Sequence, residues 1–276
     1  MPNSVLDDYV ENGLRGKAPL TVKTYRQELE TFQRWLDGAG TNLEEFSRTD
    51  VQQYIDYLVA KKKSAATINK QWSAIKSFAK WSDRPEVIAD IRVVKAMDIK
   101  KQAPKALDKV ERSKLIREAD RSGKKRDFAI IIMLLHTGLR VSELVGLNKG
   151  DVDMSDRKGE VRVVGKGNKE RTIPLSVEVR RVLCEYLELR TDKIPALFIS
   201  NRMCRISVRS VQTILSEYQV HPHLMRHTFI TGLVRKKEDI AVIQSLSGHS
   251  SADMIIRHSQ PSEEDMARAV ENIYTD

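Results

Sequence analysis

Residues 126–144 read RDFAIIIMLLHTGLRVSEL, and this stretch decides the fold of the second half of the chain. Its apolar run from Phe128 to Leu135 is too continuous for a surface helix and predicts a helix buried in a core. The run is also well short of the ~20 residues that a membrane-spanning helix needs. Gly138 ends the predicted helix, so Arg140 stands where a new helix begins and can project its guanidinium toward a phosphate.

Glu143 follows Arg140 at the spacing of one helical turn. A carboxylate at that position can hold the guanidinium in a fixed direction. An Arg/Glu pair three residues apart is, however, more often a surface ion pair than part of an active site. Both interpretations stay open on this stretch alone.

A hairpin is predicted beyond this stretch, because residues 160–164 and 171–175 alternate in polarity and enclose the tip GKGNKE. The tip places Lys166 where it can reach a phosphate or a groove. A desolvated ammonium group gives up its proton readily, so Lys166 is also a candidate proton donor. The alternative is a basic turn without a role.

The segment HPHLMRH begins at His221 and carries a third candidate site. Pro222 suits the first turn of a helix, so His223 and Arg226 share one face near its positive end. Together they can hold a phosphate. A metal site formed by His221, His223 and His227 is the alternative, but no cysteine or acidic residue in the segment supports it. We expect no metal and no cofactor.

The rest of the second half is predicted to be helical around one small antiparallel sheet. Helical periodicity covers residues 109–121, 126–136, 179–189, 208–218, 224–234, 240–246 and 263–273.

The first hundred residues predict a small helical bundle. One helix is expected over 21–36 with a stop at Gly38, a second begins at a capping box of Thr49 and Gln52, and a third follows Ser64. The fold class is therefore mainly α.

Helical periodicity weakens after Arg84 and Pro104 interrupts it, which predicts a basic linker. We expect a helical domain over 1–100, a linker over 101–107 and a second domain over 108–276.

The chain of 276 residues has a net charge of +9, and both halves are basic. Such a balance favours a polyanionic partner, and clustered lysines with short polar side chains suit DNA phosphates. An ordinary solvated helix face is the alternative. Two cysteines are too few for a disulfide framework, which favours a cytoplasmic protein. The candidate DNA-binding residues are Lys61, Lys62, Lys63, Lys70, Lys76, Lys80, Lys100, Lys101, Lys169 and Arg171.

In this order and spacing the motifs resemble the tyrosine recombinases, the lambda-integrase-like or Xer-like site-specific recombinases. The resemblance covers nearly the whole chain, with 1–100 similar to the core-binding domain and 108–276 similar to the catalytic domain. It implies that the two domains close on duplex DNA as a C-shaped clamp. The matching positions are Arg140, Glu143, Lys166, His223, Arg226 and, within LSGHSS, His249.

One position departs from the family's pattern. The nucleophilic tyrosine of the family lies nine residues after the last matched histidine, and here that residue is His258. Tyr274 is the one tyrosine further along, but it lies sixteen residues beyond and near the C-terminus. Reacting atoms must approach to ~3–3.5 Å, so we do not expect Tyr274 to substitute. No motif supports an attack by His258 itself.

The resemblance implies a metal-free transesterification through a 3′-phosphotyrosine. Arg140 and Arg226 would neutralise the phosphate oxygens, His223 and His249 would add hydrogen bonds, and Lys166 would protonate the departing oxygen. The sequence as it stands would then bind DNA without cleaving it.

The resemblance also implies partners and a setting. The expected partner is a duplex site with inverted half-sites, bound by a dimer at each site and a tetramer in the synapse, with the C-terminal helix a candidate for exchange between subunits. Integration, excision or resolution, in a mobile element, is the expected task. The alternative is a recombinase-derived DNA-binding protein without chemistry.

Overall fold

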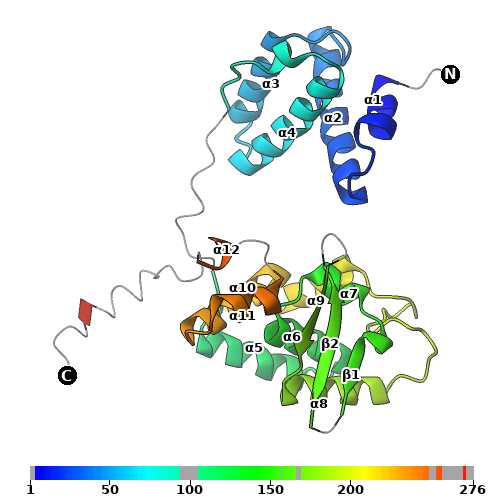
Figure 1. The fold of residues 1–276 in the computed structure, drawn as a ribbon, viewed down its shortest axis with the longest axis vertical. Coiled ribbons are helices and arrows are strands. Elements are labelled where there is room, and N and C mark those ends of the chain that lie inside the picture. The colour runs from blue at the N-terminus through cyan, green and yellow to red at the C-terminus, as the bar shows by residue number, and fades with distance from the viewer. Residues whose placement is uncertain are drawn as a thin grey trace. The chain divides into compact units, whose positions relative to one another are not determined.

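The structure, a computed structural model, describes residues 4–93, 105–155, 157–165, 169–248, 253–256 and 270–271. The chain divides into two compact units, one within residues 1–99 and the other within residues 100–276. Figure 1 shows that both units are helical and that the second also carries a small sheet. The predicted fold class, mainly α with one small antiparallel sheet, is confirmed.

The N-terminal unit is a helical bundle whose apolar faces meet in one core. Phe32 and Tyr54 pack in its centre with ring centroids 4.8 Å apart, and both are buried. Its elements are α1 (Val5–Asp8), the π-helical turn η1 (Tyr9–Gly13), α2 (Pro19–Ala39), α3 (Arg48–Ala60), α4 (Ala65–Trp81) and the 3-10 turn η2 (Pro85–Ile88).

Helix α3 begins two residues earlier than the sequence predicts. Ser47 caps it, because its hydroxyl accepts from the backbone N–H of Asp50 and the Asp50 carboxylate accepts from the backbone N–H of Ser47 at 2.7 Å. The predicted capping box of Thr49 and Gln52 is therefore wrong. Asp50 satisfies the backbone N–H of the cap residue, which is the donor that a glutamine at the same spacing would satisfy.

Helix α2 also runs past the predicted stop at Gly38. It continues to Ala39, and Gly40 ends it with a left-handed φ of +80°. The predicted start of the third helix is confirmed, because the Ser64 hydroxyl accepts from the backbone N–H of Thr67.

Helix α6 (Lys125–Thr137) is the core of the C-terminal unit, as its apolar run predicts. Its side chains from Phe128 to Leu135 are all buried, and α5, α8, α9 and α10 pack around it. The other described helices of the unit are α5 (Lys109–Arg121), α7 (Val141–Gly146), α8 (Val177–Glu188), α9 (Val208–Glu217), α10 (Pro222–Arg235), α11 (Ile240–Ser247) and α12 (Asp253–Ile256), with the 3-10 turn η4 (Lys149–Asp151).

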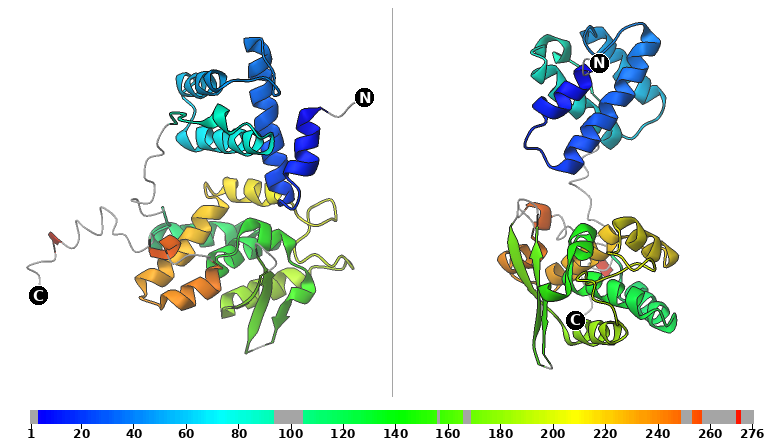
Figure 2. Two further views of the ribbon diagram at one scale, coloured as in Figure 1. Left: turned by 45° about the horizontal axis from the view of Figure 1, so that its top comes forward. Right: turned by 90° about the vertical axis from the view of Figure 1, so that its right-hand side faces the viewer.

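The predicted hairpin is present, and a third strand extends it. Strands β1 (Val152–Met154), β2 (Gly159–Val164) and β3 (Glu170–Pro174) form an antiparallel sheet in that order. Strand β1 is three residues long, too short for alternation to reveal it. The sheet stands along one side of the unit (Figure 2), and β3 contacts α11.

The end of the predicted linker is attached to the C-terminal unit. The backbone N–H of Leu107 donates to the Thr228 hydroxyl of α10 at 2.9 Å. Residues 101–104 and, except for 270–271, the predicted helix over 263–273 lie outside the described residues. No described helix combines the length and apolar character that crossing a bilayer requires.

Candidate active site

The turn between α6 and α7 fixes the position of Arg140. Gly138 ends α6 with a φ of +61°, and a Cβ at this residue would lie 2.3 Å from Cδ1 of Phe229 on α10. Only glycine fits both the left-handed backbone and this close approach. Arg140 then has an extended backbone and begins α7.

Glu143 accepts hydrogen bonds from Arg140 in two ways. One carboxylate oxygen accepts from the backbone N–H of Arg140 at 2.8 Å, and the other accepts from its guanidinium at 3.0 Å. The Glu143 side chain is 5% exposed, so this is not the solvated surface pair that the spacing allows. The carboxylate both caps α7 and orients the arginine.

A second guanidinium binds the same carboxylate. Arg171 on β3 donates to both oxygens of Glu143, at 3.0 and 2.9 Å, and its Nε donates to the carbonyl of Leu246 on α11 at 3.1 Å. Its side chain is 11% exposed. The guanidinium of Arg171 faces Glu143 rather than solvent, and the expected contact of Arg171 with DNA stays a prediction.

A signal for this inward direction was present in the sequence. Arg171 alternates with Ile173, which is buried, and pairs across the sheet with Val163, which is also buried. Alternate residues of a strand share a face, so Arg171 belongs to the inner face of the hairpin.

Arg226 enters the site from α10 and is 5% exposed. Its guanidinium donates to the carbonyls of Gly138 at 2.6 Å and Ser247 at 2.7 Å. Burial lowers the pKa of Arg226 to about 10, with a further contribution from the charge of Arg140, so it remains cationic at neutral pH. Arg140 donates to the next carbonyl, that of Gly248, at 3.3 Å.

Among the described residues, the site has more positive than negative charge. Burial by itself would raise the pKa of Glu143, but hydrogen bonds from Arg171 and from the backbone of Arg140 outweigh it and lower the pKa. One carboxylate thus faces the guanidinium cluster, which we define as Arg140, Arg171 and Arg226. Arg226 is hydrogen-bonded to carbonyls rather than to a carboxylate, and such a cluster suits a phosphate.

The histidine segment lies at the start of α10. His221 caps the helix, because its Nδ1 accepts from the backbone N–H of Leu224 at 3.2 Å. His223 is exposed one turn before Arg226, and its ring centroid lies 6.4 Å from that of His227. Within the described ranges, no group of three or more His, Cys, Asp or Glu side chains is arranged to hold a metal ion.

Lys166, His249 and His258 lie outside the described residues, but the chain next to two of them is described. A Cβ on Gly165 would lie 3.5 Å from Nη1 of Arg171 and 3.7 Å from Oε1 of Glu143. Gly248, before His249, accepts from Arg140. The chain therefore approaches the guanidinium cluster immediately before both residues.

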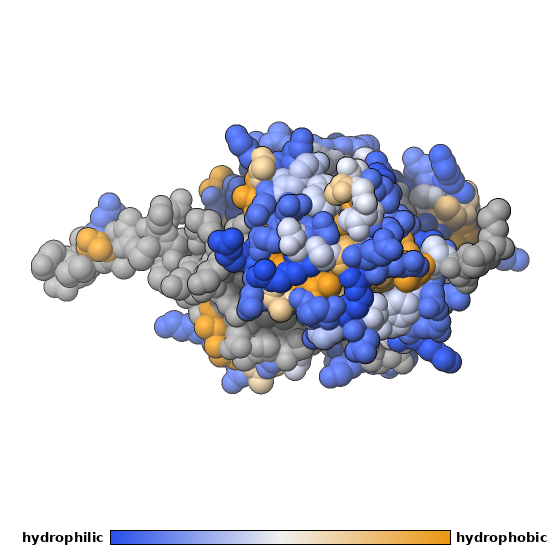
Figure 3. Space-filling model, turned by 90° about the horizontal axis from the view of Figure 1, so that it is seen from above, coloured by the Kyte–Doolittle hydropathy of each residue, from blue (hydrophilic) through white to orange (hydrophobic). Residues whose placement is uncertain are grey.

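The predicted basic residues of the N-terminal unit lie on or next to α3 and α4. Lys61, Lys62 and Lys63 are exposed after α3, and Lys80 is exposed on α4. Figure 3, which looks down on this unit, shows a mainly hydrophilic face. Lys100 and Lys101 lie outside the described residues, and Lys169 is exposed immediately before β3.

Two of these lysines have specific neighbours. Lys70 pairs with Glu28 at 2.5 Å, and Lys76 lies over the Trp72 ring at 5.4 Å. With Lys61 and Lys63, Lys70 lines a groove of about 870 Å³.

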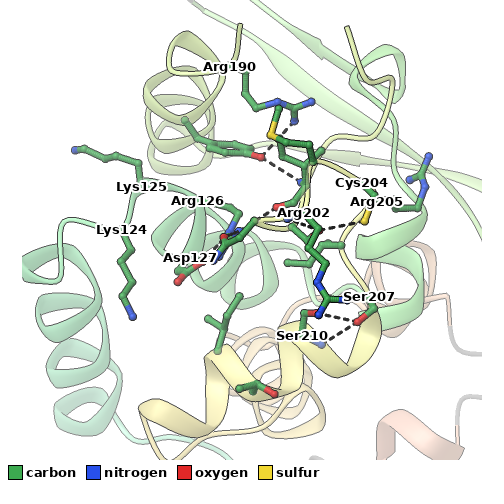
Figure 4. Close-up of a pocket in the computed structure, with 18 of the residues that line it drawn as sticks. Lys124, Lys125, Arg126, Asp127, Arg190, Arg202, Cys204, Arg205, Ser207 and Ser210 are labelled. Carbon is green, nitrogen blue, oxygen red and sulfur yellow. Dashed lines mark hydrogen bonds and ion pairs between the residues drawn. The ribbon is translucent and has the colours of Figure 1, made fainter. Parts of the chain in front are cut away.

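A cavity of about 1070 Å³ lies elsewhere in the C-terminal unit, between the start of α6 and α9 (Figure 4). Two ion pairs lie in its lining: Arg126 donates to Asp127 at 2.8 Å, and Lys124 contacts Glu217 at 2.9 Å. None of the described predicted site residues lines this cavity.

Known proteins resemble this chain in both sequence and fold. The phage integrase family matches residues 105–264, and the phage integrase N-terminal SAM-like domain matches residues 7–84. The tyrosine recombinase XerC of Thermodesulfovibrio yellowstonii is 33% identical over 259 residues, which cover 86% of this chain and 84% of that protein.

Solved structures share the fold. The XerH recombinase bound to its difH substrate has a TM-score of 0.72 at 20% identity, over 98% of this chain and 85% of that one. The Tn1549 transposon integrase bound to circular intermediate DNA has a TM-score of 0.71 at 20% identity, over 97% of each chain.

Replacing Glu143 should destabilise the C-terminal unit in a pH-dependent way. Glu143→Gln leaves two guanidiniums without their counter-charge and should lower the free energy of unfolding by about 3 kcal/mol at neutral pH. The folded-state pKa of Glu143 is lowered, so its stabilisation is complete above the unfolded value of about 4.3 and is lost as the pH falls through the folded value. Urea unfolding at stepwise lower pH measures this.

Glu185→Gln is the matched control. Glu185 pairs with Lys125 at 2.6 Å and is 29% exposed, so its loss should cost about 0.5 kcal/mol. Equal losses in the two variants, or a Glu143→Gln deficit that stays constant down to acid pH, would contradict the charge argument.

Proposed function

The chain belongs to the phage integrase family, the tyrosine recombinases, and we propose that its guanidinium cluster is the phosphate-binding part of a strand-exchange site for duplex DNA. The observation that carries this proposal is the meeting of Arg140 and Arg226 at consecutive carbonyls, Gly248 and Ser247, at the end of α11. The two guanidiniums come from different elements. Both can therefore donate to one phosphate between them.

The proposed reaction is a metal-free transesterification. The oxygen of a tyrosine at position 258, where this chain has histidine, attacks the scissile phosphorus, releases its proton to water and forms the phosphotyrosine bond, while the bond from phosphorus to the 5′ oxygen breaks. Arg140 and Arg226 stabilise the charge on the non-bridging oxygens, and His223 and His249 add hydrogen bonds. Lys166 gives the leaving 5′ oxygen its proton. Glu143 holds Arg140 in place.

Position 258 decides whether this chain completes the reaction. His258 stands where the family has its nucleophile. A covalent mechanism without its nucleophile loses the step itself. We infer that the chain as given binds its site without cleaving it. The alternative, a recombinase-derived DNA-binding protein without chemistry, is favoured by His258 and opposed by the intact pairing of Arg140 with Glu143.

The proposed DNA partner is a site with inverted half-sites. The N-terminal unit acts as the core-binding domain and the C-terminal unit as the catalytic domain, and the two close around the duplex. A dimer binds each site and two sites form a tetramer. The likeness to XerH, which was solved on its difH substrate, supports DNA as the partner.

The biological task we propose is integration, excision or resolution by a mobile element, acting in the cytoplasm. The fold shared with the Tn1549 transposon integrase supports the mobile-element setting. The 33% identity to a XerC recombinase supports site-specific recombination.

Restoring the nucleophile should restore cleavage. The chain as given should form no covalent adduct with a nicked suicide substrate, whereas His258→Tyr should form one that survives SDS. Adding Arg226→Gln to His258→Tyr should slow adduct formation by about 10²–10³-fold, because a charge-stabilising donor is removed. Denaturing gels and adduct mapping measure both effects.

The control is DNA binding, which His258→Tyr should leave unchanged. An adduct of the chain as given at Tyr274 or His258 would refute the nucleophile assignment. No adduct from His258→Tyr on its proper site would favour the DNA-binding alternative.

The exposed lysines should set the salt dependence of DNA binding. Replacing Lys61, Lys62 and Lys63 by Gln should reduce the slope of log K against log salt by about 0.9 for each DNA phosphate that the variant no longer neutralises. Lys114→Gln is the control, because Lys114 on α5 is exposed beside Glu118 and is not among the predicted DNA-binding residues. Equal slopes for the two variants in a salt titration would remove residues 61–63 from the interface.

The C-terminal segment should join subunits. Met266, Ala269, Val270 and Ile273 are spaced as one apolar helix stripe, which must be buried somewhere. Deleting 262–276 should therefore weaken assembly on DNA from tetramer to dimer or monomer, measured by light scattering. Unchanged assembly would mean that the segment docks on its own subunit.

A further inference from the structure

We propose that Arg171 is a positioning residue for the recombination reaction. From β3 it holds the Glu143 carboxylate with one edge of its guanidinium and the last turn of α11 with its Nε. It thereby fixes the positions of α7, which begins at Arg140, and of α11 relative to β3. The inference rests on the proposed function and deepens it.

The hydrogen bonds of Arg171 engage all three nitrogens of its guanidinium. Nη1 and Nη2 donate to the two oxygens of Glu143, and Nε donates to the carbonyl of Leu246. The side chain is 11% exposed, and the fork geometry of the pair with Glu143 fixes direction as well as distance. The three N–H groups that make these bonds can donate to a DNA phosphate only if the bonds break.

This single side chain connects three separate elements. Arg171 pairs with Val163 across the hairpin, Glu143 belongs to α7, and Leu246 belongs to α11. The hairpin leads into Lys166, α7 begins at Arg140, and α11 leads into His249. Each of these three proposed catalytic groups is thus next in the chain to an element that Arg171 contacts.

Two glycines show how closely the backbone approaches this guanidinium. A Cβ on Gly248 would lie 3.0 Å from Nη1 and 3.1 Å from Cζ of Arg171, and a Cβ on Gly165 would lie 3.5 Å from Nη1. Gly248 also has a left-handed φ of +65°. The backbone before His249 and the backbone before Lys166 therefore both rest against Arg171.

Charged groups from three elements act on Glu143. Arg140 begins its own helix, Arg171 approaches from β3, and Arg226 contributes from α10. Arg171 is the strongest of the groups that lower the pKa of Glu143, against a burial effect that raises it. Without Arg171, the effect of burial on Glu143 is opposed less strongly, so the pKa of Glu143 rises. Its bond to the Arg140 guanidinium is then lost at a higher pH.

The first experiment needs no reaction. Hydrogen exchange is measured on the chain as given and on Arg171→Gln, with Arg171→Lys as the variant that keeps the charge. Exchange of the Gly248 amide, which donates to Gln244 at 2.8 Å, should be at least about tenfold faster in Arg171→Gln. Arg171→Lys should lie between the two proteins, because a lysine keeps the charge but not the fork.

Arg205→Gln is the matched control. Arg205 donates to the carbonyls of Val145, Gly146 and Leu147 at the other end of α7, at 2.9, 2.8 and 2.8 Å. It loses a comparable set of bonds without touching Glu143. Its exchange at Gly248 should match that of the chain as given.

The second experiment uses His258→Tyr as the parent. Adding Arg171→Gln should slow adduct formation by about 10²-fold at neutral pH, as a small misplacement does. Because the pKa of Glu143 rises, the fall in rate at acid pH, the acid limb of the pH–rate profile, should begin at a higher pH. Arg171→Lys should keep this limb near that of the parent. Arg205→Gln should leave the limb in place.

The outcomes separate this inference from the proposed function. If His258→Tyr forms no adduct, the proposed function fails, and the exchange of Gly248 alone decides the role of Arg171. Unchanged exchange in Arg171→Gln refutes that role. A lower rate with an unmoved acid limb also refutes it, because the pKa of Glu143 would then not depend on Arg171. If Arg171→Gln does not fold, Arg171→Lys decides the question by hydrogen exchange: faster exchange at Gly248 than in the chain as given supports the role, and unchanged exchange refutes it.

Discussion

A buried carboxylate between two guanidiniums organises the C-terminal unit. Glu143 is 5% exposed and accepts from the side chains of both Arg140 and Arg171. A buried carboxylate is costly unless it is paired and hydrogen-bonded. Its requirement for partners therefore fixes where α7 begins, which way β3 faces and where α11 ends, and these three choices define the site.

The remaining positive charge is held by main-chain carbonyls instead of acids. Arg226 donates to Gly138 and Ser247, and Arg140 donates to Gly248. Carbonyl dipoles satisfy the donors without cancelling the charge, so the site stays attractive to an anion. The buried helix α6 supports this arrangement, because its end at Gly138 supplies one of the carbonyls and its packed core resists displacement.

Most helices and the hairpin were predictable from the sequence, because apolar periodicity records which face is buried. The run from Phe128 to Leu135 predicts α6, and alternation predicts β2 and β3. The start of α3 was misplaced, because two overlapping patterns, at Ser47 and at Thr49, compete for one cap. The strand β1 was missed because three residues carry too little alternation.

The sequence by itself determined the family and the fold class, through motif order and periodicity, and its three-residue spacing predicted that Glu143 can orient Arg140. It placed Arg171 among DNA contacts, and only the tertiary structure directed it to Glu143. That interaction joins residues 28 positions apart and adds α11, a further 75 positions along. Local patterns do not specify such distant partners. The need to neutralise a buried charge, met only when β3 and α11 pack beside α7, selects them.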